Sequence, residues 1–328
     1  MTDAAADTGA ADIAVDSAPT EVAAAIDSSA VIVADPLPSI PTPAKKAPIG
    51  AVLAAVPSNA DAFAGHLLRC LQTRAGADAV LQFLCYSSKL SGAVLETLSR
   101  NALRQSAQKL VAMAFQLPPA TTVVLASAPA PPGAALALSL ATKLKAFAAV
   151  LSEARTINRL WGLLGLYFAL KRVIAGPRAK KQDSEKESSD AVVEARFDTV
   201  FSVAQIVTLI LYQIFENLAF LGSKKAIDLK PATMGKFGLL SVRCWGAYTF
   251  MELSRLLLER TRRSAKAKDA TWAKTWNKSF FRNLAWAPLT VHWGMAGGGP
   301  LPETLVALLA MYPSTGQMID LWRETAMA

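Results

Sequence analysis

Apolar residues recur at spacings of three and four through most of the chain after residue 57, and no alternating apolar and polar runs bounded by turn pairs interrupt them. This pattern predicts an all-α fold. Segments rich in proline, glycine or charge break it at 117–133, 176–190 and 294–303. The second of these, GPRAKKQDSEKESSD, holds four bases and four acids and no apolar run, so we expect a solvated loop at 176–190.

The first 57 residues are rich in alanine, aspartate, serine and proline. A segment of this composition cannot bury a core, so we expect residues 1–57 to form a disordered tail. The helical domain is then expected to occupy residues 58–326, with Ser58 as the N-cap of its first helix.

The segment 200–222, VFSVAQIVTLILYQIFENLAFLG, is the best candidate for a membrane span, which needs about 20 mostly apolar residues. Polar side chains nevertheless follow one face of this helix, at Asp198, Ser202, Gln205, Tyr212 and Glu216. Such a polar seam either packs against other helices or lines a water-filled path.

The end of the seam carries an adjacent acid and amide, Glu216 and Asn217, followed after Gly222 by Lys224 and Lys225. An unpaired acid in lipid would be costly by several kcal/mol. We therefore expect the helix to stop at Gly222, and Glu216 and Asn217 to bond to a neighbouring helix or to the backbone of the turn. The two lysines are expected at the membrane interface.

A second helix, 78–115, shows a seven-residue repeat of Gln82, Lys89 and Glu96, and Arg100 extends that polar face. The opposite face includes Leu81, Leu84, Leu95 and Leu98. Such a helix either lies in the membrane interface or covers the core of a helical bundle, and the pattern alone does not separate these two interpretations.

A third segment, 143–172, aligns Lys145, Ser152, Arg155 and Arg159 on one face, and Trp161 and Tyr167 fit an interfacial aromatic belt. The segment 259–282 combines eight bases, two acids, two tryptophans and two phenylalanines. Interleaved bases and aromatic residues favour an anionic membrane surface, and a solvated helix end is the alternative.

Composition strengthens the membrane interpretation. Apolar residues make up 52% of the chain and charged residues only 18%, against about 25% in an average soluble chain. The net charge of +9 combines −5 in the first 57 residues with +14 in the remainder. A basic body suits anionic lipid. The bases follow no pattern typical of nucleic-acid binding, so we expect no nucleic-acid partner.

Nothing in the sequence points to catalysis. His66 and His292 are the two histidines, and no nucleophile motif, phosphate loop or metal-ligand spacing accompanies them. We therefore expect no enzyme, no cofactor and no metal site. The three cysteines, Cys70, Cys85 and Cys244, lack metal or redox spacing and are expected to be reduced, buried thiols.

Four segments, in this order, carry a family resemblance. TRAGADAVLQFLCYSSKL supplies Gly76, Asp78, Tyr86, Ser87 and Lys89. LSEARTINRLWGLLGLY supplies Arg155, Arg159 and Leu160. YQIFENLAFLGSKKAI supplies Tyr212, Glu216, Asn217, Lys224 and Lys225. The ending from FFRNLAWAPLTVHWGM onward contains the pair His292 and Trp293. Over residues 58–326 the chain resembles the peroxin-eleven family of peroxisomal membrane elongation proteins, and specifically its fungal C-type branch.

The resemblance implies a peroxisomal membrane protein that controls organelle elongation, division and abundance. It implies that the helix mapped onto 78–104 inserts into one leaflet and bends it, and that fission machinery, other family members and a second copy of the chain are partners. Ala77 and Ala79 stand where the family has bases, so we expect weaker attraction of this helix to anionic lipid. A channel for small metabolites is the alternative function.

Overall fold

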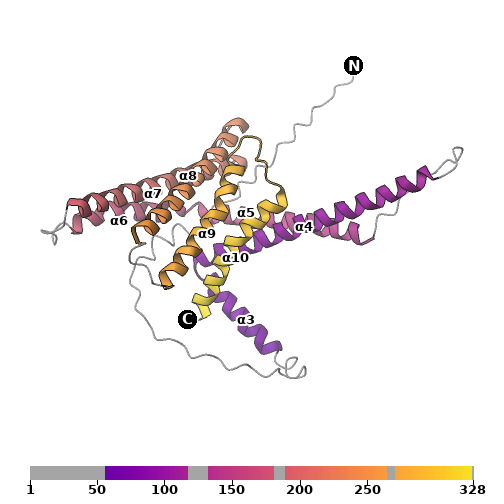
Figure 1. The fold of residues 1–328 in the computed structure, drawn as a ribbon, viewed down its shortest axis with the longest axis horizontal. Helices are drawn as coiled ribbons and strands as arrows, with labels where there is room; N and C mark the ends of the chain where they lie inside the picture. The colour runs from indigo at the N-terminus through magenta and orange to yellow at the C-terminus, as the bar shows by residue number, and fades with distance from the viewer. Residues whose placement is uncertain (1–55, 117–131, 181–188, 264–269, 327–328) are drawn as a thin grey trace, which may run out of the picture.

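The computed structural model describes residues 56–116, 132–180, 189–263 and 270–326. These residues form eight helices, and no strand occurs among them (Figure 1). The helices are α3 (Val56–Leu71), α4 (Arg74–Phe115), α5 (Pro132–Arg159), α6 (Gly162–Lys180), α7 (Ser189–Ser223), α8 (Pro231–Arg263), α9 (Ala270–Trp293) and α10 (Glu303–Ala326). The all-α prediction is confirmed for this part of the chain.

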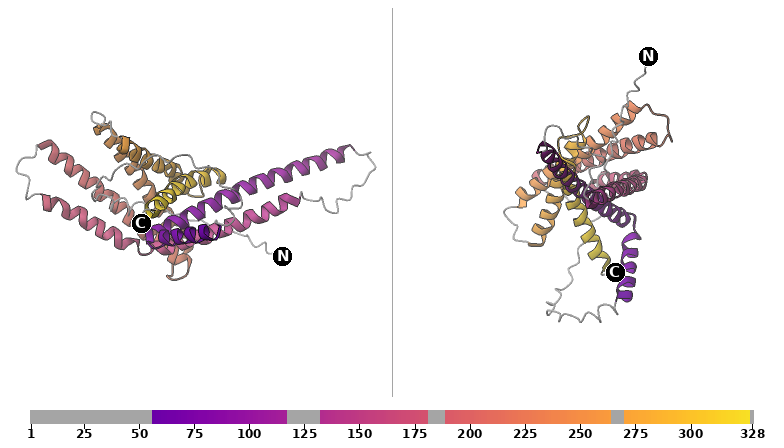
Figure 2. Two further views of the ribbon diagram at one scale, coloured as in Figure 1. Left: turned by 90° about the horizontal axis from the view of Figure 1, so that it is seen from below. Right: turned by 90° about the vertical axis from the view of Figure 1, so that its right-hand side faces the viewer.

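Two long helical hairpins extend in opposite directions from a shared centre (Figure 2). One hairpin is α4 with α5, and the other is α6 with α7. Helix α8 packs along α7, α9 packs on α8, and α10 packs on both α9 and α4. Helices α9 and α10 therefore join the two sides of the molecule.

The main core lies where the two sides meet. Trp286 of α9 packs its ring 5.7 Å from that of Tyr86 on α4 and 5.4 Å from that of Trp245 on α8, measured between ring centroids. A smaller cluster between α4 and α5 contains Cys85 and Ala148. Aromatic side chains thus connect α4 to α8 and α9, which follow it in the chain by more than 100 residues.

Several element ends match the sequence. The turn expected at 294–303 is present between Trp293 and Glu303, and Gly297 and Gly298 adopt positive φ angles of 84° and 87° there. No heavy atom lies within 4 Å of a Cβ built on either glycine, so these glycines are needed for backbone conformation and not for space. Pro132 begins α5, where a missing N–H costs nothing.

Two predicted boundaries are wrong by a few residues. The first helix begins at Val56 and not at Ser58, so the tail prediction applies to residues 1–55, which lie outside the described residues. The loop expected at 176–190 is shorter, because α6 continues to Lys180 and α7 begins at Ser189. Basic residues favour the last turn of a helix, as at the end of α6, and Ser and Asp favour the first turn, as at the start of α7. These preferences explain why both helices extend into the predicted loop.

Candidate functional site

The polar seam of α7 faces the interior of the molecule from Gln205 to Glu216, whereas Asp198 at its other end is exposed. Gln205 donates a hydrogen bond from Nε2 to Oε2 of Glu252 on α8, at 2.9 Å. Asp198 accepts hydrogen bonds from Nη1 of Arg262 on α8, the shorter at 3.0 Å. Of the two interpretations of the seam, the packed one agrees with these contacts.

Glu216 lies at the centre of the molecule and is 1% exposed. Arg159 of α5 donates to it twice, from Nε to Oε2 at 2.9 Å and from Nη2 to Oε1 at 3.0 Å. The hydroxyl of Tyr212 and the amide of Gln213 also donate to this carboxylate, at 3.0 and 3.3 Å. A carboxylate with four donors around it is fully compensated for the loss of water. The partner expected on a neighbouring helix is therefore Arg159.

A second buried ion pair lies one turn earlier on α5. Arg155 is 0% exposed and donates to both carboxylate oxygens of Asp78 on α4, at 3.2 and 3.3 Å. Its Nη2 also donates to Oε1 of Gln82 at 2.9 Å, and Gln82 donates onward to Ser314 of α10 at 3.1 Å. The central polar network, defined as these two ion pairs with their hydrogen-bonded neighbours, thus ties α4, α5, α7 and α10 together.

The chain turns back after α7, as expected, but the lysines do not reach Glu216. Lys224 forms an ion pair with Glu153 of α5, and Lys225 is exposed with a φ of 58°. Asn217 donates to the carbonyl of Leu160 at 3.4 Å. Helix α7 ends at Ser223, one residue beyond Gly222.

The opposite face of α7 is apolar and points outward. Its exposed or half-buried positions follow spacings of three and four, at Phe197, Val200, Ala204, Val207, Leu211, Ile214 and Leu218. No charge interrupts this outer stripe of α7 over 21 residue steps, which is about 31 Å of helix. Helix α7 therefore has its polar side inside and its apolar side outside.

Helix α5 is arranged in the same way towards its C-terminal end. Of the polar residues predicted to share one face of segment 143–172, Arg155 and Arg159 are buried, whereas Lys145 and Ser152 are half-buried. The buried side of α6 is apolar, with Leu166 and Ala169. The outward sides of the two helices carry Lys143 and the large apolar residues Leu136, Leu140, Phe147, Val150, Ile157, Leu164 and Phe168. Trp161, at the junction of the two helices, is 66% exposed. By length and composition, the segments Gly133–Arg159 and Arg196–Ser223 are long and apolar enough to cross a membrane.

The two predicted faces of α4 differ in how they are covered. Gln82, on the polar face, is buried with Asp78, whereas Leu84 and Leu98 on the apolar face are exposed. Leu81 and Leu95 are half-buried. Helices α5 and α10 cover the side that carries Asp78 and Gln82, where Arg155 neutralises the acid. Insertion of the exposed apolar side into a membrane interface stays a prediction.

Farther along α4, polar residues form a smaller cluster at the surface. Arg100 donates to Glu96 at 2.8 Å, and Lys145 of α5 pairs with both Glu96 and Glu303. These contacts hold the pKa of Glu96 below its ordinary value, chiefly through the hydrogen bond from Lys145 and then that from Arg100. Lys89 lies with its ammonium 5.4 Å from the ring centroid of Tyr86.

Bases and aromatic rings lie close together where α8 ends and α9 begins. The guanidinium of Arg260 lies 4.6 Å from the ring centroid of Trp276, whose Nε1 donates to the carbonyl of Leu256 at 2.8 Å. Trp276 also stacks on Phe280, at a centroid distance of 4.8 Å. Trp276 is buried by these contacts, so it belongs to the packing of α8 against α9. Binding of segment 259–282 to an anionic membrane surface stays a prediction.

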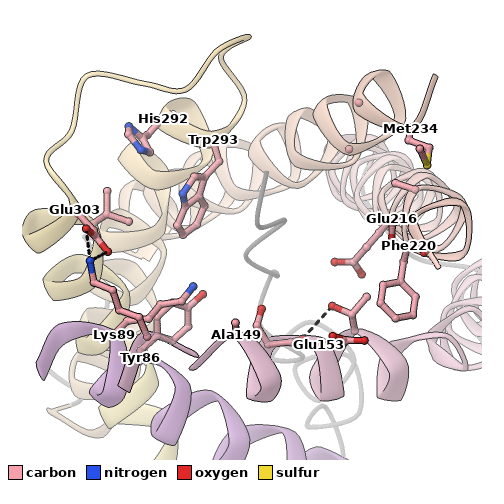
Figure 3. A pocket seen from close by; sticks show the side chains of 18 of the residues that line it. Tyr86, Lys89, Ala149, Glu153, Glu216, Phe220, Met234, His292, Trp293 and Glu303 are labelled. Carbon is pink, nitrogen blue, oxygen red and sulfur yellow. Dashed lines mark hydrogen bonds and ion pairs between the residues drawn. The ribbon is translucent and has the colours of Figure 1, made fainter. Parts of the chain in front are cut away.

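A large cleft lies beside the central network, with a volume of about 900 Å³. Figure 3 shows it between α5 on one side, α7 and α8 on a second, and the α9–α10 connection on a third. Glu216 reaches its inner wall, and Trp293 and His292 line the α9 side. The Nδ1 atom of His292 accepts a hydrogen bond from the backbone N–H of Leu301 at 3.2 Å, so this histidine shapes the turn.

Sequence reasoning missed several members of the network, namely Asp78 and Gln82 as partners of Arg155, and Gln213 as a partner of Glu216. The available signal was the isolated acid Asp78 in an apolar run, opposite two arginines spaced one turn apart in 155–159. Within the described residues, no group of three or more His, Cys, Asp or Glu side chains is placed to hold a metal ion.

Comparison with known proteins adds little about function. No model of a known protein family and no solved structure matches the chain significantly. An uncharacterized protein of Schizosaccharomyces pombe is 30% identical to this chain over 106 residues, which are 32% of this chain and 51% of that protein. The match thus covers about half of the relative's length.

Proposed function

We propose that the chain is a peroxisomal membrane protein that regulates peroxisome elongation, division and abundance. It does so by remodelling the membrane and by recruiting fission factors. Membrane lipids, other copies of the chain and related membrane proteins are its proposed partners, and it is proposed to be no enzyme.

The observation that carries the membrane part of this proposal is the orientation of α5 and α7. In a water-soluble bundle, amphipathic helices turn their apolar side inward. Here Arg155, Arg159 and Glu216 are inside, and the outer stripe of α7 is outside. Acyl chains would cover such a stripe at no cost, and buried charges within a membrane protein are paired in this way. The stripe's length, about 31 Å, is close to the thickness of the hydrocarbon core, about 30 Å.

The organelle part rests on the four sequence segments that resemble the peroxin-eleven family. Three of them supply the central network: Asp78 of the first segment meets Arg155 of the second, and Arg159 of the second meets Glu216 of the third. The segments that carry the resemblance are therefore also the ones that hold the two sides of the molecule together. This supports a common structural role for those motifs.

Fractionation and microscopy of cells that express the tagged chain test the proposal. We expect the chain to co-sediment with peroxisomal markers, to resist extraction by high salt, and to change the number of elongated peroxisomes when deleted or overproduced. A variant with Val207→Asp and Leu211→Asp on the outer stripe should lose membrane retention. Asn277→Asp, which adds one charge at an exposed polar site of α9, is the control. Release of the wild-type chain by salt alone would contradict membrane integration.

A channel for small metabolites is a second candidate, and the specific observation for it is the cleft that reaches Glu216. Against it, the α7 seam is filled by hydrogen bonds to α5 and α8. Flux of small solutes through liposomes that contain the purified chain separates the two functions. Remodelling predicts elongated liposomes without flux, and a channel predicts flux that Glu216→Gln alters.

A further inference from the structure

The 900 Å³ cleft is built from one face of each helix that borders it. Helix α5 supplies Lys145, Ala149, Ser152 and Thr156, which follow one another at spacings of four, three and four. This wall is therefore about 16 Å long. The cleft is large enough, and long enough, for an extended organic molecule of about the size that protein pockets commonly bind.

Apolar residues and glycines form the walls of the cleft on α7 and α8. Ala219 and Phe220 border it from α7, and Met234, Gly235 and Gly238 border it from α8. No heavy atom lies within 4 Å of a Cβ built on Gly235, so the space in front of this helix is open. Apolar walls with open space between them favour an apolar molecule over water.

Charged side chains line the cleft in two places. Glu153 and Lys224, which pair with each other, line it near Phe220. At the other end, Lys89 of α4 and Lys145 of α5 line it together with Glu303. Lys145 contacts both Glu96 and Glu303, and the Glu303 side chain is 64% exposed. Glu303 can therefore swing into solvent while Glu96 still neutralises part of the charge on Lys145. The acidic group of a bound molecule could then replace the Glu303 carboxylate at Lys145. The acid nearest the middle, Glu216, is already compensated by Arg159 and would not repel an anion.

The geometry points to a binding site for an acyl chain with an anionic head, either a fatty acid or a monoacyl phospholipid. The chain lies along Ala149, Phe220 and Gly235, and the carboxylate or phosphate replaces Glu303 at Lys145, beside Lys89. This site goes beyond the proposed function and does not depend on it, because a membrane-remodelling protein needs no such cleft.

Binding of parinaric acid, a fluorescent fatty acid, to the purified full-length chain in detergent tests the site. Gly235→Leu should fill the cleft without distorting α8 and should weaken binding about tenfold or more. The matched control is Gly165→Leu on α6, where a built Cβ also meets no atom within 4 Å and which does not border the cleft. This control should bind like the wild type. Equal binding by the Gly235→Leu variant would overturn the site.

Competition identifies the head group. Palmitate and lysophosphatidic acid should displace the probe, and hexadecanol, which has the same chain without an acid, should displace it far less. Displacement by palmitate alone assigns a carboxylate, and displacement by lysophosphatidic acid alone assigns a phosphate. Lys89→Met and Lys145→Met should each weaken the binding of palmitate and lysophosphatidic acid and leave the binding of hexadecanol unchanged. Equal potency of alcohol and acids, or no effect of either lysine variant, would overturn the anionic head.

Discussion

Arg159 and Glu216 form a two-pronged ion pair between α5 and α7, with N–O distances of 2.9 and 3.0 Å, in the centre of the molecule. The two helices belong to hairpins that extend in opposite directions, and they touch each other only over a short length (Figure 2). The ion pair therefore lies at the joint between the two sides, and its geometry fixes how they meet.

Breaking this pair from one side should destabilise the fold strongly. Glu216→Leu leaves the Arg159 guanidinium buried without its counter-charge, which costs about 3 to 5 kcal/mol. We expect a lower melting temperature in detergent and a lower steady-state abundance in cells. The double variant Arg159→Met with Glu216→Leu removes both charges and should recover most of the loss. A double variant that is no more stable than Glu216→Leu would show that the pair is not the cause.

Glu216→Gln should destabilise the fold less than Glu216→Leu. Glutamine keeps the shape and one acceptor oxygen, but it leaves the charge of Arg159 uncompensated. We expect a stability between those of the wild type and Glu216→Leu, measured in the same melting experiment. Wild-type stability of this variant would mean that hydrogen bonding alone holds the joint.

The polar seam of α7 could be predicted because its residues are spaced at three, four and seven on one helix, and a charge beside an apolar surface must find a partner. The sequence alone could not show which residue is that partner. Arg159 is 57 positions away, and which helices meet depends on how the hairpins cross. The burial of Gln82 on the polar face of α4 could not be predicted for a related reason. Hydropathy separates the two sides of a helix, but it cannot tell that Arg155 would make the side with Asp78 and Gln82 suitable for burial.

Lys225 offers a stabilising substitution. It adopts a φ of 58° directly after α7, and the N–H of Ala226 donates to the carbonyl of Leu221 at 2.9 Å, an arrangement in which glycine is preferred. Lys225→Gly should raise the free energy of unfolding by about 1 kcal/mol. Lys225→Ala, which removes the charge and keeps the backbone penalty, is the control. A rise in melting temperature that alanine reproduces would assign the effect to charge.

The ion pairs of Glu96 should make the stability of the fold depend on pH. Because the Lys145 and Arg100 contacts lower the pKa of this carboxyl in the folded state, it stabilises the fold above its ordinary pKa of 4.5. That contribution is lost as the pH falls through the lowered value. Glu96→Gln should therefore melt below the wild type at pH 7, and the two curves should converge in acid. Asp228→Asn, an exposed carboxylate after α7, is the control, and a difference that persists in acid would contradict the account.

The exposed side of α4 can be tested for lipid contact. Leu98 is 60% exposed and Val80 is buried. Leu98→Asp should weaken binding of the full chain to liposomes that contain anionic lipid while leaving the melting temperature nearly unchanged. Val80→Asp should instead lower the melting temperature, because it buries a charge. Unchanged liposome binding by Leu98→Asp would remove this part of α4 from the membrane surface.

Cysteine reactivity reports on how tightly the helices pack. Cys70 and Cys85 are fully buried, as predicted, and Cys85 donates from Sγ to the carbonyl of Ala148 at 3.3 Å, whereas Cys244 is only half-buried. Burial also raises the pKa of the Cys244 thiol, so little of it is the reactive thiolate near neutral pH. In the native chain we expect iodoacetamide to label Cys244 slowly and the other two scarcely at all, as read by mass spectrometry.

Denaturation in SDS should expose all three cysteines, and Cys244→Ser should abolish labelling of the native chain. Rapid labelling of Cys85 in the native chain would mean that the α4–α5 hairpin opens on the timescale of the reaction, and the packing described for that hairpin would not hold.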